Sequence, residues 1–319
     1  MRAAASAVVV SVLAVAVVLT VGFPGAMADP PESAPDGMLP PSFRQIDQGP
    51  AGGTLWQGVI PNKEVPEARR HAVVYLPPNV SPAIRYPVLY LLHGFHGSPY
   101  AYSAGLHLAD AADSAIETHA VRPFIAVAPP AGVTKRFDGE WSGVWERYVV
   151  RDVIPWVESH LPVARTRAAR AIAGLSAGGY GAVDIGLRHP ELFQTLESWS
   201  GYFGPVHDGS LAGADAVQIA AHDPSLLVAD ESRELHALGT RFFLSSGTTH
   251  DRWSAGQTAG FARELASLGL PYELVLKPGG HNGAFWRAQL AAALRFALAP
   301  APSSRMLLHQ PIGRRTRAG

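Results

Sequence analysis

The stretch RAIAGLSAGGYGA, residues 170–182, decides how the rest of the chain is expected to fold. After Arg170, residues 171–175 are an apolar run typical of a buried strand, and the residues after Ser176 have the pattern of a helix that ends before Pro190. Gly174 and Gly178 flank the serine and leave room for a tight turn. The pattern therefore predicts a strand-to-helix corner that exposes one serine hydroxyl.

Short apolar runs recur on both sides of this stretch, at 71–78, 86–94, 123–130, 169–175, 195–201, 241–247 and 272–280. Helix-periodic segments separate most of them, at about 105–118, 145–160, 178–189, 255–268 and 284–298. Strands that alternate with helices predict an α/β fold with a mostly parallel sheet covered on both faces. Because no helix separates the first runs, they are expected to open the sheet in antiparallel fashion.

The N-terminal residues have the pattern of a secretory signal. Arg2 supplies one positive charge, an uncharged apolar run follows as far as Phe23, and Ala26-Met27-Ala28 fits a small-x-small cleavage site. We expect residues 1–28 to be removed on export, which would leave no stable membrane span. A retained membrane anchor is the alternative, because the apolar run approaches the length needed to cross a bilayer.

The remaining chain divides into three expected parts. Residues 29–52 are rich in proline and polar side chains and predict a flexible spacer. Residues 53–298 contain all the alternating runs and predict one catalytic domain. Residues 299–319 end in several arginines and predict a disordered basic tail.

Composition excludes several kinds of chemistry. The 26 Lys and Arg residues balance 26 Asp and Glu residues, so no basic excess suggests nucleic acid as a partner. The chain has no cysteine, which excludes a cysteine nucleophile, an iron–sulfur cluster and a thiolate zinc site.

A serine nucleophile needs a base and an acid, and where a serine stands at such a corner these follow in the order acid, then histidine. His281 occupies the loop between the last strand and the last helix, where the base is expected. Asp251 follows the run 241–247 and is the preferred acid, which would orient the imidazole. His250 is a weaker alternative for the base, and the alternative acids are Asp208, Asp215, Asp223 and Asp230.

An oxyanion hole requires two backbone N–H groups that point at the developing charge. Ala177, directly after the nucleophile, should provide one of them. Phe95, in the glycine-rich loop after the run 86–94, should provide the other. His93 and His96 could instead suggest a metal site, but two ligands are too few, and no metal is expected.

Four segments resemble the Putative esterase family of α/β hydrolases, which includes antigen 85 mycolyltransferases, S-formylglutathione hydrolases, feruloyl esterases and enterochelin esterases. They are LLHGFHGS (91–98), GVWERYVVRDVIPWVESHLPV (143–163), AIAGLSAGGYGAVDIGLRHPELF (171–193) and GGHNGAFWRAQL (279–290). The resemblance covers about residues 53–298 and implies an α/β-hydrolase fold. It also implies the triad Ser176, Asp251 and His281, with Phe95 and Ala177 at the oxyanion hole. Antigen 85 proteins have glutamate as the acid, so their sugar-binding side chains are not transferred.

Together these observations predict a secreted serine carboxylic-ester hydrolase that works through an acyl-enzyme and needs no cofactor. The substrate is expected to be a small-molecule, lipid or sugar ester. Two alternatives remain: an acyltransferase acting on envelope lipids or sugars, and a non-catalytic wall-associated protein on the same scaffold. Segment 205–239 is expected to overhang the site. Segment 136–143 is expected to form a wall, in which Asp138 and Trp141 either contact substrate or form a structural turn.

Overall fold

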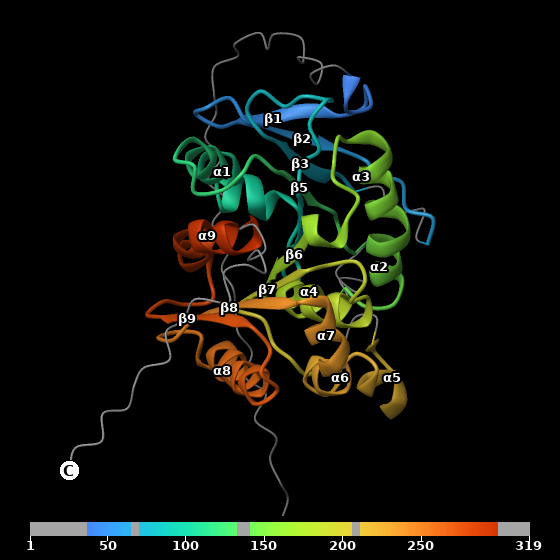
Figure 1. Cartoon of the computed structure of the whole chain (residues 1–319), viewed down its shortest axis with the longest axis vertical. Helices are drawn as coiled ribbons and strands as arrows, with labels where there is room; N and C mark the ends of the chain where they lie inside the picture. The colour runs from blue at the N-terminus through green and yellow to red at the C-terminus, as the bar shows by residue number, and fades with distance from the viewer. Residues whose placement is uncertain (1–36, 65–69, 133–140, 206–210, 299–319) are drawn as a thin grey trace, which may run out of the picture. The chain divides into compact units, whose positions relative to one another are not determined.

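The computed structural model describes residues 37–64, 70–132, 141–205 and 211–298 (Figure 1). A nine-stranded sheet runs through them in the order β1-β2-β3-β5-β4-β6-β7-β8-β9. The strands are β1 (Arg44–Gln48), β2 (Thr54–Gly58), β3 (Ala72–Leu76), β4 (Val88–Leu92), β5 (Ile125–Ala128), β6 (Arg170–Leu175), β7 (Thr195–Trp199), β8 (Arg241–Gly247) and β9 (Tyr272–Lys277).

The strands from β5 to β9 in this order are all parallel, whereas β1, β2 and β3 pair in antiparallel fashion. The expected mostly parallel sheet is confirmed. The antiparallel opening differs in detail from the prediction, because β3 pairs with β5 and not with β4. Strand β4 lies between β5 and β6 and is parallel to both.

Helices cover both faces of the sheet (Figure 1). Helices α1 (Leu108–Glu117) and α9 (Gly283–Leu298) pack on one face. The opposite face is covered by α2 (Val144–Arg147), α3 (Ile154–His160), α4 (Ala177–Arg188), α6 (Pro224–Asp230), α7 (Ser232–Leu238) and α8 (Arg252–Ser267). A π-helical turn, Tyr148–Val153, joins α2 to α3.

Strand β4 shows why this apolar run forms a central strand. Its five residues are all buried. Tyr90 and Leu92 join the core on the α4 face, and Leu89 and Leu91 join the core on the α9 face. Since successive side chains of a strand point to opposite faces, a continuous apolar run fits a strand covered on both sides.

The spacer predicted for residues 29–52 is corrected from residue 37 onward. Strand β1 lies within it and pairs with β2. Met38, Leu39 and Phe43 are buried, and the Phe43 ring stacks on Trp156 with the ring centroids 5.3 Å apart. These apolar residues stand among prolines and so show no periodicity in the sequence. The signal prediction for 1–28 and the tail prediction for 299–319 lie outside the described residues.

Segment 205–239 contains three short helices that the apolar pattern did not predict: α5 (Ala216–Ala220), α6 and α7. Their N-termini include two carboxylate caps, with Asp215 capping α5 and Asp223 capping α6. The segment is attached to α4, because the Tyr180 hydroxyl donates to the His222 carbonyl oxygen at 2.6 Å. Among the described helices, none is long and apolar enough to cross a membrane.

Candidate active site

Ser176 stands at the predicted corner between β6 and α4, with φ 53° and ψ −118°. A non-glycine residue adopts a positive φ only under constraint, and such strain is typical of functional sites. The flanking Gly178 is required by close packing, because a Cβ at this position would overlap the carbonyl oxygen of Leu92. The chain therefore holds one half-buried serine in a strained turn at the carboxyl end of a central parallel strand.

Asp251 and His281 are brought together by pairing that continues beyond the ends of β8 and β9. His250 and Gly280 form an isolated parallel bridge, and the His250 N–H donates to the Gly279 carbonyl oxygen at 3.1 Å. The residues that follow this bridge are therefore neighbours. The Asp251 Oδ2 accepts a hydrogen bond from the His281 Nδ1 at 3.0 Å. His250, the weaker candidate for the base, contributes backbone pairing to this arrangement.

The two members of this pair differ in exposure. Asp251 is buried, with 6 % of its side chain exposed, whereas the His281 side chain is 37 % exposed. The imidazole packs edge-on against Trp286, with the ring centroids 5.1 Å apart. The Trp286 indole in turn donates to the Ser200 hydroxyl at 3.1 Å. Contacts on two sides thus fix the orientation of the imidazole.

Backbone contacts tie the serine corner to the same edge of the sheet. The Ser176 N–H donates to the Trp199 carbonyl oxygen at 2.9 Å, and the Ser200 N–H donates to the Ser245 carbonyl oxygen at 2.7 Å. These bonds connect the carboxyl ends of β6, β7 and β8 in turn. Within the described residues no hydrogen bond joins the Ser176 hydroxyl to the His281 imidazole.

The predicted oxyanion loop lies against the serine. A Cβ placed on Gly94 would be 3.3 Å from the Ser176 Cβ. The Phe95 side chain is 43 % exposed, and its ring centroid lies 3.8 Å from that of His96. Ala177 is the first residue of α4, where the helix supplies no partner for the N–H group. Ala177 thus directly follows the serine, and Gly94, the residue before Phe95, packs against it.

His93 and Trp141 are structural neighbours beneath this loop. His93 is buried, and its two ring nitrogens are both engaged, with Ala131 N–H and the Gly94 carbonyl oxygen. Across the described residues, no group of three potential ligands could hold a metal ion. Of the two alternatives for Trp141, the structure favours the structural one: the side chain is buried, and its indole donates to the His93 carbonyl oxygen at 2.9 Å. Asp138 lies outside the described residues.

The alternative acids have other roles or positions. The Asp215 carboxylate accepts from the backbone N–H groups of residues 217 and 218, and the Asp223 carboxylate accepts from those of residues 225 and 226. Asp230 is the last residue of α6. Asp208 lies outside the described residues. Among the described candidates, Asp251 is the one that contacts His281.

A second histidine–carboxylate pair was missed by the sequence reasoning. The His222 Nδ1 lies 2.7 Å from the Oδ2 of Asp184, which is fully buried in α4. Burial raises the pKa of the Asp184 carboxyl above its ordinary value. Asp184 follows Ser176 by eight residues, or about 12 Å along a helix, which is too far to serve that serine. An acidic residue within the apolar stretch GAVDIGL was the available signal.

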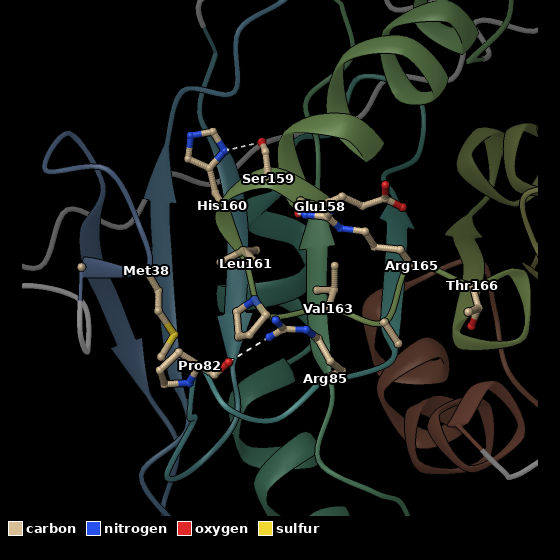
Figure 2. Close-up of a pocket in the computed structure, with 13 residues that line it drawn as sticks. Met38, Pro82, Arg85, Glu158, Ser159, His160, Leu161, Val163, Arg165 and Thr166 are labelled. Atoms are coloured by element: carbon tan, nitrogen blue, oxygen red, sulfur yellow. Dashed lines mark hydrogen bonds between the residues drawn. The ribbon is translucent and has the colours of Figure 1, made fainter.

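A cavity of about 850 Å³ lies at the other end of the strands (Figure 2). Its lining includes residues 158–166, which lead from α3 toward the amino end of β6. In Figure 2 the Arg85 guanidinium donates to the Pro82 carbonyl oxygen at 2.8 Å. Since Ser176, Asp251 and His281 follow the carboxyl ends of their strands, this cavity is separate from the candidate active site.

The sheet order and the two helical layers define an α/β hydrolase. The family model described as Putative esterase matches residues 64–297, and the chain belongs to this family. The predicted fold class and family are both confirmed.

The sequence identity to individual relatives is below 30 % for the two proteins described next. The chain is 28 % identical over 234 residues to Esterase Rv1288 of Mycobacterium tuberculosis. The matched region covers 61 % of this chain and 48 % of that protein. It thus spans about half the length of this relative. The MPT51/MPB51 antigen of the same organism is 26 % identical over 226 residues, covering 62 % of this chain and 74 % of the antigen.

Solved structures share the fold. A ferulic acid esterase superposes with a TM-score of 0.69 at 23 % identity, covering 77 % of this chain and 98 % of the other. An S-formylglutathione hydrolase from Staphylococcus aureus superposes with a TM-score of 0.61 at 20 % identity, covering 79 % of this chain and 100 % of the other.

Proposed function

We propose that this chain is a secreted serine hydrolase of carboxylic esters, with Ser176 as nucleophile, His281 as base and Asp251 as the orienting acid. The observation that carries the proposal is the His281–Asp251 hydrogen bond of 3.0 Å, at the same sheet edge as the strained serine corner. Membership of the Putative esterase family supports it. In substrate-free enzymes the hydrogen bond between nucleophile and base is often long and tightens when substrate binds.

The proposed reaction follows from these positions. The Ser176 Oγ bonds to the ester carbonyl carbon while its proton passes to the His281 Nε2. The N–H groups of Phe95 and Ala177 stabilise the negative oxygen that forms. The bond to the leaving alcohol then breaks, and His281 returns the proton to that alcohol. Water repeats these steps on the acyl-enzyme and releases the acid.

Hydrolysis is favoured over transfer to a second alcohol by the exposure of the base. More than a third of the His281 side chain is exposed, so water can reach the atom that would activate it. An acyltransferase must keep water away from its acyl-enzyme, and an exposed base works against this.

The residues around the site favour a substrate with a flat apolar group. Trp253, two residues after Asp251, is 59 % exposed, and the Phe95 side chain is 43 % exposed. The Trp253 ring centroid lies 5.5 Å from that of Tyr202. Aromatic side chains of this kind bind planar groups by stacking and edge contacts. The structural similarity to a ferulic acid esterase supports the same substrate class.

Replacing the nucleophile tests the proposal. We expect Ser176→Ala to fold normally and to lose nearly all hydrolysis of p-nitrophenyl esters, because alanine has no hydroxyl to form the acyl-enzyme. A serine-directed phosphonate should label Ser176 in the wild type, as read by peptide mass spectrometry. Full activity of the variant, or labelling of another serine, would show that the assignment is wrong.

A further inference from the structure

His93 follows β4 and is buried beneath the loop that passes Ser176. Its Nε2 accepts a hydrogen bond from the Ala131 N–H at 3.0 Å, so this nitrogen carries no proton. The proton of the neutral ring is therefore on Nδ1, which donates to the Gly94 carbonyl oxygen at 2.9 Å. The hydrogen bonds thus select one tautomer of the ring.

The Gly94 carbonyl oxygen accepts a second hydrogen bond, from the Gly97 N–H at 2.9 Å. This carbonyl belongs to the same peptide unit as the Phe95 N–H. In a planar trans peptide the C=O and N–H bonds point in opposite directions. The two donors hold the Gly94 carbonyl oxygen on one side of the peptide, so the Phe95 N–H points to the opposite side. They also polarise this peptide unit, which makes the Phe95 N–H a stronger donor.

Two further observations agree with this geometry. The Gly94 Cα lies beside the serine, as shown by the 3.3 Å separation between a Cβ placed on it and the Ser176 Cβ. Within the described residues, the Phe95 N–H donates to no backbone acceptor. This N–H group is therefore oriented by its own carbonyl and remains available for a ligand.

We propose that His93 is a positioning residue that fixes the plane of the Gly94–Phe95 peptide and so directs the Phe95 N–H toward the oxyanion. The inference rests on the proposed function, since it assigns a role within that reaction. His93 never touches the substrate. Burial lowers the pKa of its imidazole to about 4, which keeps the ring neutral over the range in which esterases are assayed.

Trp141 also contacts His93, through both its backbone and its ring. Its indole donates to the His93 carbonyl oxygen at 2.9 Å, and its ring lies edge-on to the imidazole with the centroids 5.1 Å apart. Both the backbone and the ring of His93 are therefore held in place.

A matched pair of variants separates the two hydrogen bonds of the His93 ring, the one that Nδ1 donates to Gly94 and the one that Nε2 accepts from Ala131. The side-chain amide nitrogen of asparagine can occupy the place of Nδ1, so His93→Asn keeps the donor to Gly94. The amide oxygen of glutamine can occupy the place of Nε2, so His93→Gln keeps the acceptor for Ala131 and loses the donor. We expect His93→Gln to lower kcat by about 100-fold, the scale for one oxyanion donor, with KM unchanged. His93→Asn should keep kcat near the wild-type value.

The affinity for a trifluoromethyl ketone, which forms a tetrahedral adduct on the serine, should fall in parallel with kcat. Equal losses in both variants, or a loss in KM alone, would overturn the positioning role. The wild type offers a test that requires no folded variant: ¹⁵N NMR of labelled histidine, with the His93 signals assigned, should show the His93 ring protonated on Nδ1 and unchanged between pH 8 and 5. Protonation of the His93 ring on Nε2 overturns the inference. Absence of any esterase activity in the wild type would instead contradict the proposed function.

Discussion

The difference in exposure between Asp251 and His281 fits their proposed roles. A buried carboxylate in contact with imidazole stabilises the charged form of the ring, which arises when the base accepts the serine proton. An exposed imidazole can meet both substrate and water. Ser246 adds a weak hydroxyl contact to the Asp251 Oδ2 at 3.4 Å, so the carboxylate has a further partner inside the sheet.

Removal of the Asp251 charge tests its role at the residue scale. We expect Asp251→Asn to fold normally and to lower kcat by up to about 10⁴-fold, the loss known for the corresponding change in a serine protease. The amide can no longer hold the Nδ1–H tautomer that leaves Nε2 free to accept the serine proton. Steady-state kinetics with a p-nitrophenyl ester measure the loss.

Asp223→Asn is the matched control, because asparagine caps a helix about as well as aspartate and Asp223 caps α6. Its kcat should stay near the wild-type value. If Asp223→Asn abolishes activity while Asp251→Asn does not, segment 205–239 supplies the acid.

His93 also predicts how stability depends on pH. Burial lowers its pKa from the ordinary 6.5 to about 4 in the folded chain. Between these values the unfolded chain binds the proton and the folded chain does not, so the free energy of unfolding falls as pH decreases from about 6.5 to 4. The full displacement corresponds to up to about 3 kcal/mol.

Urea unfolding of the wild type and of His93→Asn at pH 7 and pH 4.5 measures this contribution. The wild type should lose about 2–3 kcal/mol more than the variant between the two pH values, because asparagine does not titrate. Other groups titrate equally in both proteins and cancel. An equal loss in both would show that His93 is not held neutral by the fold.

At the scale of elements, the start of α8 links the acid to a row of aromatic rings. Tyr180 in α4 stacks on Tyr202 with the ring centroids 5.0 Å apart, and Tyr202 contacts Trp253 in α8. Tyr180, Tyr202 and Ala177, the residue after Ser176, form one buried cluster. The row therefore runs from the serine corner to an exposed indole, and one end of α8 carries both the acid and this ring.

Trp253→Ala tests whether this ring selects substrate. We expect KM for methyl esters of cinnamic-type acids to rise by about 2- to 13-fold, since an aromatic pair contributes about 0.5–1.5 kcal/mol. KM for p-nitrophenyl acetate should change little, and Trp253→Phe should restore most of the lost affinity. Stability should stay near the wild-type value, because the side chain is 59 % exposed.

Leu226→Ala is a control for the loss of an exposed apolar side chain elsewhere, since Leu226 is 53 % exposed on α6. It should leave both KM values unchanged. Equal KM changes for acetate and cinnamate esters in Trp253→Ala would argue against a ring-binding role.

At the scale of the whole molecule, the features carried by local pattern were predicted from the sequence. The corner at Ser176 depends on neighbouring glycines, and the parallel strands depend on continuous apolar runs, so both are visible in one short window. His281 and Asp251 followed from the order of elements in this fold. Strand β1 was missed because none of its own residues is buried: it is held by pairing with β2 next to the buried Phe43, and neither feature produces a period in the sequence.

The burial of Trp141 could not be predicted either, because its hydrogen-bond partner His93 lies 48 residues earlier in the chain. Contacts at such separation leave no periodic signal. The helices of segment 205–239 had a local signal in Asp223-Pro224, a cap followed by proline at the first helical position, which was not used.

Export is the last prediction, and it concerns the chain as a whole. Cleavage after Ala28 would precede Met38, one of the buried residues of the folded domain, by nine residues, so we expect the domain to survive removal of the signal unchanged. N-terminal sequencing of protein from the culture medium should begin at Asp29. Substitution of both Ala26 and Ala28 by leucine should block cleavage and retain the precursor in the membrane fraction, because the cleavage site requires small residues at these two positions. An intact N-terminus on membrane-bound wild-type protein would favour the anchor, and the esterase site would then act at the membrane surface.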